Sequence, residues 1–226
     1  MIPLHDNIKS RRWPLVNVTL ILLNAAVFFI EITAPSPQAL ESLFSRWSLV
    51  PDLLFSSPFT QWPRVFTSMF IHGGWMHFLG NILYLWIFGD NVEDRMGHFR
   101  YLLFYLAAGT AAALTQSLFN PASRIPMMGA SGAIAGVLGA YFLLYPKAKV
   151  LTFIPLWLFS RIVEIPAFFF LGFWFLMQTV QGLGSLAQQA LRGDQGGVAW
   201  GAHAGGFLAG VILLPFLKRK RNRGFF

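Results

Sequence analysis

Long apolar stretches are the feature of this sequence that most limits how it can fold. A helix needs about 17 to 25 apolar residues to cross a hydrocarbon core of roughly 30 Å. Six segments approach or reach that length: 13–33, 75–88, 99–118, 131–145, 165–186 and 198–217. The chain is 55% hydrophobic and only 12% charged, with a mean hydropathy of +0.56. A soluble domain does not have this composition, so the sequence predicts an all-α membrane protein with six transmembrane helices.

The basic residues are divided unevenly between the two sides that six spans define. Thirteen of the 17 Lys and Arg residues fall on one side, and the other four are Arg46, Arg64, Arg124 and Arg192. Because cytoplasmic loops retain basic residues, we expect both termini in the cytoplasm. The expected parts are a cytoplasmic segment 1–12, one membrane domain 13–217 in the cell membrane, and a basic tail 218–226. Anionic lipid then explains the net charge of +8 without nucleic acid.

Polar side chains inside apolar spans mark candidate functional positions, because they are costly in lipid. His77 and Asn81 lie in the second span, Ser131 begins the fourth, and His203 lies near the start of the sixth. These three spans all run from the outside inward, which predicts similar depths for the four side chains. The fourth span is short, since a helix over 131–145 rises only about 22 Å. We therefore expect Ser131 below the outer surface, in a cavity that opens to the outer side.

Ser131 lies between glycines in the string Gly129-Ala130-Ser131-Gly132. At a helix N-terminus the backbone N–H groups lack intrahelical partners and can stabilise a developing oxyanion, which favours a nucleophilic serine. Serine is also a preferred N-cap residue, and the string alone does not decide between these interpretations. No strand precedes it, so the strand–turn–helix elbow of soluble hydrolases does not apply.

Glycines follow His203 on its own helical face, at Gly206 and Gly210. Small residues allow two membrane helices to approach closely, and the fourth span offers a matching row of Gly132, Gly136 and Ala140. Contact between these rows would bring the histidine toward the serine. A neutral imidazole there could accept the hydroxyl proton and return it to a leaving group.

The sequence supplies no acidic residue in a position to orient His203. Asp194 falls in a predicted loop, and Glu164 is predicted on the opposite side of the membrane. A two-residue catalytic unit follows if the serine is a nucleophile. The alternative is a buried histidine that donates a hydrogen bond to a carbonyl.

His77 and Asn81 are four residues apart and so lie on one helical face. Two such side chains could donate hydrogen bonds to one oxyanion. Interhelical hydrogen bonding is an alternative role. A metal pair of this spacing normally needs a third ligand, and we identify none, so no metal or other cofactor is expected.

Four motifs occur in order along 60–215: Trp62-x-Arg64, His72-x4-His77-x3-Asn81, Gly-Ala-Ser131-Gly and Ala-His203-x2-Gly206-x3-Gly210. Their combination resembles the rhomboid intramembrane serine proteases in their prokaryotic six-helix form. The resemblance implies a rhomboid-like bundle whose short fourth helix carries the nucleophile. It also implies a Ser131–His203 dyad and an oxyanion hole made by His77, Asn81 and the backbone N–H of Ser131.

The resemblance further implies substrates that are membrane proteins, cut in or beside a transmembrane segment. It assigns structural support to a set of residues around the site: His72, Arg64, Glu93, Gly129, Gly132, Gly206 and Gly210. Ordinary interfacial charges are the alternative for Arg64 and Glu93. One departure concerns Ala135, where many members carry an aromatic residue that stacks on the histidine.

Two other functions compete with proteolysis. A catalytically inactive rhomboid-like protein would bind membrane proteins without cutting them. A transporter or proton channel would need intramembrane carboxylates, and only Glu31 lies in an apolar run, near its outer end where we expect water to reach it. The sequence leaves the oligomeric state open.

Overall fold

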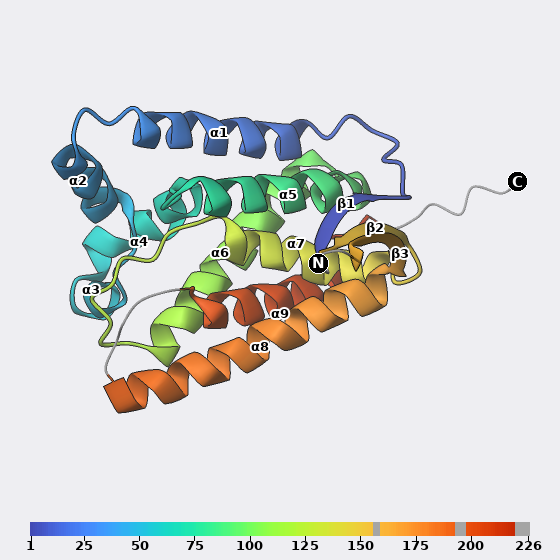
Figure 1. The fold of residues 1–226 in the computed structure, drawn as a ribbon. Coiled ribbons are helices and arrows are strands. Elements are labelled where there is room, and N and C mark those ends of the chain that lie inside the picture. The colour runs from blue at the N-terminus through green and yellow to red at the C-terminus, as the bar shows by residue number, and fades with distance from the viewer. Residues whose placement is uncertain (156–158, 193–197, 220–226) are drawn as a thin grey trace, which may run out of the picture.

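Six long helices form the body of the protein in the computed structural model, which describes residues 1–155, 159–192 and 198–219. They are α1 (Leu15–Ile32), α5 (Trp75–Met96), α6 (His98–Phe119), α7 (Ser131–Leu144), α8 (Ala167–Arg192) and α9 (Trp200–Leu217). Successive long helices run in opposite directions (Figure 1). The starts of α1, α6 and α8 therefore lie at the same end of the bundle as the ends of α5, α7 and α9.

The helix bounds agree closely with the predicted spans, with two extensions. Helix α5 continues past Phe88 to Met96, and α8 continues to Arg192. Asp194 and the basic tail beyond Arg219 lie outside the described residues.

The connection between α1 and α5 is built of short helices at one end of the bundle. These are α2 (Pro37–Trp47), α3 (Pro51–Ser56), α4 (Pro58–Thr67) and the single 3-10 turn η1 (Ser68–Phe70). Proline occupies the first turn of α2, α3 and α4, where its missing N–H has no helical partner to lose. Arg64 donates to the carbonyl oxygen of Ser45 at 3.0 Å, which ties α4 to α2.

A three-stranded antiparallel sheet at the other end was not predicted from the sequence. Its order is β1 (Ile2–Asp6), β2 (Lys149–Ile154) and β3 (Arg161–Pro166). The N-terminal segment, expected only as a charged stretch, thus pairs with a strand almost 150 residues away. The Asp6 carboxylate accepts hydrogen bonds from Tyr141 on α7 and Asn91 on α5, and burial raises the pKa of Asp6. The fold is therefore a helical bundle with a small added sheet.

Four of the described helices are long and apolar enough to cross a membrane: α1, α6, α8 over 167–188, and α9. Helix α7 is apolar but has only 14 residues. Helix α5 ends in a polar segment that includes Asp90, Glu93 and Asp94. Membrane passage of α5 and α7, and so the count of six spans, stays a prediction.

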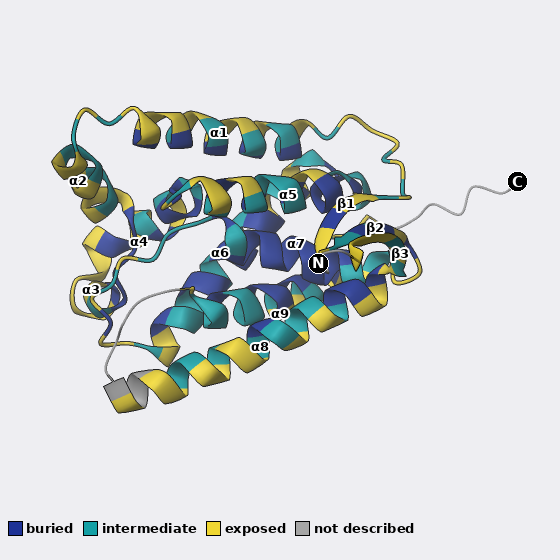
Figure 2. Ribbon diagram, viewed as in Figure 1, coloured by how far each residue is buried: buried dark blue, intermediate teal, exposed yellow. Residues whose placement is uncertain are grey.

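Helix α7 lies at the centre of the bundle. Every residue from Gly132 to Tyr141 is buried, and the helix is dark blue throughout this stretch in Figure 2. A helix that is apolar on all faces belongs inside a protein or a membrane. The helix that begins at Ser131 is thus held on all sides by its neighbours.

Polar residues at seven-residue intervals face the bundle along α1. Asn17, Asn24 and Glu31 are each at most 3% exposed. Glu31 was expected where water reaches it, but it is 3% exposed and accepts a hydrogen bond from the backbone N–H of His72 at 2.9 Å. That expectation was wrong because the segment before α5 covers the end of α1.

Glu93 on α5 closes the N-terminus of α1. Its carboxylate accepts from the backbone N–H groups of Val16 at 3.0 Å and Asn17 at 2.7 Å. These are donors of the first helical turn, which have no intrahelical acceptor, and a carboxylate also interacts favourably with the helix dipole there. His98 lies 2.5 Å from the same carboxylate.

We expect Glu93→Ala to lower the stability of the folded protein by about 1–3 kcal/mol, because it leaves buried N–H groups unpaired. Thermal unfolding in detergent measures the effect, with Asp94→Ala on the same turn as the matched control. Equal melting temperatures for the two variants would contradict the capping role.

Candidate active site

Ser131 is the first residue of α7, and its side chain does not cap the helix. The N-cap position belongs to Ala130, with no side-chain capping bond. The N-cap interpretation of Ser131 is therefore wrong. Its hydroxyl instead lies 2.8 Å from Nε2 of His203.

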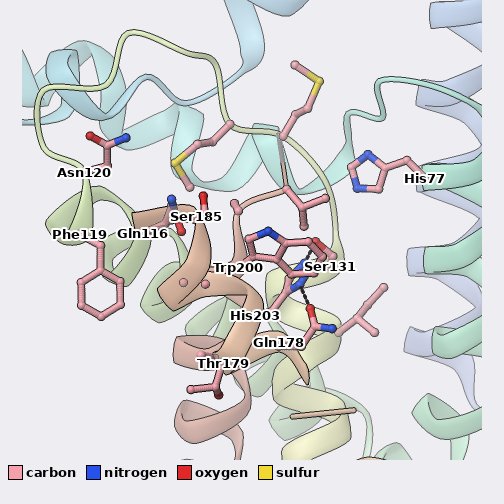
Figure 3. Close-up of a pocket in the computed structure, with 18 of the residues that line it drawn as sticks. His77, Gln116, Phe119, Asn120, Ser131, Gln178, Thr179, Ser185, Trp200 and His203 are labelled. Atoms are coloured by element: carbon pink, nitrogen blue, oxygen red, sulfur yellow. Dashed lines mark hydrogen bonds between the residues drawn. The ribbon is translucent and has the colours of Figure 1, made fainter. Parts of the chain in front are cut away.

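His203 lies in the first turn of α9, close to the serine although 72 residues separate them. Figure 3 shows the two side chains pointing toward each other, with Gln178 of α8 on the far side of the imidazole. The start of α9 is held by Gln116 of α6, whose side-chain oxygen accepts from the backbone N–H of Ala202 at 3.2 Å. Gln116 thus holds the backbone next to His203, and Gln178 contacts its side chain.

The glycine rows of α7 and α9 are in contact, as expected from the sequence. A Cβ on Gly206 would lie 2.1 Å from the carbonyl oxygen of Gly132, and one on Gly210 would lie 2.0 Å from that of Gly136. Real Cβ atoms do not approach carbonyl oxygens so closely, so glycine is required at both positions. This contact sets the distance between the helices that carry Ser131 and His203.

His77 and Asn81 of α5 lie beside Gly129, two residues before Ser131. Gly129 has a φ of +119°, and a Cβ there would lie 2.5 Å from the His77 ring and 3.8 Å from the Asn81 amide nitrogen. Glycine is thus needed at 129 both for its backbone conformation and for space. Both α5 side chains lie next to the turn that leads into Ser131.

The amide of Asn81 is held by His72, the residue that follows the 3-10 turn by two positions. Asn81 Nδ2 lies 2.9 Å from His72 Nε2. An amide nitrogen only donates, so His72 Nε2 is the acceptor and its Nδ1 carries the proton. Nδ1 can then donate to the carbonyl oxygen of Phe70, 3.3 Å away. The second N–H of Asn81 remains available to an oxyanion.

A cavity of about 940 Å³ lies next to these side chains. Residues of α5, α8 and α9 form its walls, together with the end of α6 and the segment 123–128, and Ser131 lines it as well. His77, Asn81, Ser131, Gln178 and His203 all line this cavity, which has the size of a pocket for a ligand or a short peptide.

Other residues considered in the sequence analysis lie away from the cavity lining. Arg64 and Glu93 hold α4 and α1, away from the cavity lining. Glu164 is on β3, exposed, and paired with Lys149 at 2.7 Å. Sequence reasoning missed Gln116 and Gln178, although a glutamine within an apolar run is itself a signal.

Chemically, the arrangement pairs a hydroxyl with an imidazole that can accept its proton. The side chains of His77 and Asn81 lie next to Gly129, two residues before this serine. This is the set of parts that acyl transfer requires: a nucleophile, a base and a place for the oxyanion.

Comparison with known families identifies a domain that covers most of the chain. The rhomboid domain family model matches residues 60–220, which is most of the chain and includes His77, Asn81, Ser131, Gln178 and His203. The chain belongs to the rhomboid family. Together with its apolar helices, this makes it a multi-pass membrane protein.

Relatives from bacteria and plants have similar sequences. The rhomboid protease AarA of Providencia stuartii is 27% identical over 212 residues, covering 88% of this chain and 70% of AarA. The chloroplastic rhomboid-like protein 11 of Arabidopsis thaliana is 29% identical over 179 residues, covering 75% and 58%. The rhomboid protease GluP of Bacillus subtilis is 44% identical over 80 residues, covering 35% and 15%. The match thus spans less than two thirds of the last two relatives.

We expect Gly210→Ala to push α9 from α7, because the added methyl group meets backbone that cannot rotate away. Overpacking of this kind costs about 1–3 kcal/mol. Thermal unfolding in detergent measures it, with Gly184→Ala on α8, where a Cβ meets nothing within 4 Å, as the control. An unchanged melting temperature for Gly210→Ala would show that the helices can separate freely.

Proposed function

We propose that the protein is an intramembrane serine endopeptidase that uses Ser131 as nucleophile and His203 as base. The observation that carries the proposal is the 2.8 Å contact between Ser131 Oγ and His203 Nε2 inside the cavity. The family assignment supports it, because rhomboid proteases are among the relatives. Rhomboid proteases act on transmembrane proteins, and we propose the same substrate class here.

The reaction begins when Ser131 Oγ attacks the scissile carbonyl carbon and His203 Nε2 accepts the hydroxyl proton. The tetrahedral intermediate collapses as the C–N bond breaks, and the imidazolium gives its proton to the leaving amine. Water then attacks the acyl-enzyme while His203 accepts a proton from that water. Release of the new carboxyl end returns the proton to Ser131.

The oxyanion of each tetrahedral intermediate would be bound by the backbone N–H of Ser131 and by His77 and Asn81. Asn81 is suited to this role because His72 fixes its amide. Preorganised donors of this kind stabilise charge without reorganisation at the moment of reaction. Glu31 supports the same unit indirectly by holding the backbone of His72.

We further propose six spans, α7 being the short one, with both termini in the cytoplasm of a cell-membrane protein. The support is the charge distribution. Lys9, Arg95 and Lys149 lie at the sheet end of the bundle, and Arg46, Arg64 and Arg124 lie on the short helices or the loop at the opposite end. The cavity would then open on the outer side, and lipid would surround the exposed helix faces.

We expect wild-type protein to react covalently with a fluorophosphonate probe, and Ser131→Ala and His203→Ala to lose the label. Fluorescence of the labelled band on a gel is the measurement, and Ser56→Ala on the exposed face of α3 is the control. Absence of label in the wild type would favour the inactive client-binding alternative.

Removal of one oxyanion donor by Asn81→Ala should lower turnover by roughly 10- to 1,000-fold. Initial rates on a single-span reporter and thermal unfolding together separate chemistry from folding, with Leu79→Ala on the lipid-facing side of α5 as the control. If the variant turns over normally, or if its loss of folded protein fully accounts for its lower rate, Asn81 is not an oxyanion donor.

A further inference from the structure

Gln178 of α8 contacts the one nitrogen of His203 that the serine does not use. Its Oε1 lies 2.5 Å from His203 Nδ1, and the glutamine is only 8% exposed. Figure 3 shows the three side chains in a line from Gln178 through His203 to Ser131. The amide is thus buried in contact with the histidine, at the position a carboxylate occupies in a Ser-His-Asp triad.

The direction of this hydrogen bond fixes the state of the imidazole. Gln178 Oε1 can only accept, so Nδ1 of a neutral His203 carries the proton. Nε2 then has a free lone pair, directed at the hydroxyl of Ser131. The opposite tautomer would present an N–H to the serine and could not act as its base.

We propose that Gln178 is a positioning residue that holds His203 in the tautomer and orientation required for proton transfer from Ser131. The inference rests on the proposed function, since it concerns the base of that reaction. Gln178 also provides an orienting contact for His203. Ala135 cannot provide one, because alanine has no aromatic ring to stack on the histidine.

Two tryptophan rings complete the surroundings of the imidazole. Trp174, one turn before Gln178 on α8, lies 5.9 Å from the His203 ring at 34°. Trp200 on α9 lies 5.9 Å away, nearly perpendicular at 88°. The rings restrict where the imidazole can lie, but they supply no acceptor for Nδ1–H. Within the part of the chain that the structure describes, Gln178 is the partner that selects the tautomer.

A neutral third group differs from a carboxylate in its electrostatic effect. Gln178 accepts a hydrogen bond from Nδ1–H but adds no charge that would stabilise the imidazolium. Among the described residues, the titratable side chain that interacts with His203 is His77 on α5. The acidic candidate Glu164 is paired with Lys149 on the sheet. The acidic limb of the pH profile should therefore respond to a charge introduced at 178.

The test compares Gln178→Leu, Gln178→Glu and Gln181→Leu, the last being an exposed glutamine on the same helix. Rates of fluorophosphonate labelling are measured from pH 5 to 9, with thermal unfolding of each variant. We expect Gln178→Leu to label about 10- to 100-fold more slowly, which is part of the roughly 10²–10⁴-fold that a positioned base contributes. Gln181→Leu should match the wild type.

Gln178→Glu keeps the acceptor and adds a negative charge beside the imidazole. We expect it to recover most of the labelling rate and to move the acidic limb to higher pH, a shift that a purely structural role would not produce. Wild-type rates in Gln178→Leu, or an unshifted limb in Gln178→Glu, would overturn the inference. Lack of label in wild type and Gln181→Leu alike would instead overturn the proposed function.

Discussion

The close contact between α7 and α9 is the constraint on which the rest of the structure depends. Glycine at 206 and 210 allows the backbone of α9 to meet the carbonyl oxygens of Gly132 and Gly136. No larger side chain fits there, so the distance between the two helices is set by backbone atoms rather than by flexible side chains. The relative positions of Ser131 and His203 are fixed by this contact, because each residue lies within one helical turn of it.

Hydrogen bonds from the other helices turn this contact into a defined site. Gln116 of α6 holds the start of α9, Gln178 of α8 holds the imidazole, and His72 holds Asn81. His72 and Gln178 are buried, and buried polar groups in apolar surroundings are stable only when paired. Their bonds therefore also hold the segment before α5 and helix α8 in place. Helix α8 forms a wall of the cavity, so the orientation of His203 depends on the position of α8.

Most of the successful predictions were based on the hydrophobic stretches and on the polar residues within them. The positions of the long helices, the meeting of Ser131 with His203 and the glycine contact all follow from them. The sheet could not be predicted, because β2 and β3 have only six residues each, and pairing of β1 with β2 joins segments that are far apart in the sequence. Gln178 was missed because the sequence does not show which face of α8 is turned toward α9. The burial of Glu31 was missed because the segment that covers it, around His72, is distant in sequence.

Cleavage of a single-span reporter in proteoliposomes tests the central claim most directly. Mass spectrometry of the fragments identifies the cut. The account predicts that wild-type protein produces new termini in or beside the membrane segment, and that Ser131→Ala produces none. Equal cleavage by Ser131→Ala, or cuts confined to the soluble parts of the reporter, would contradict it.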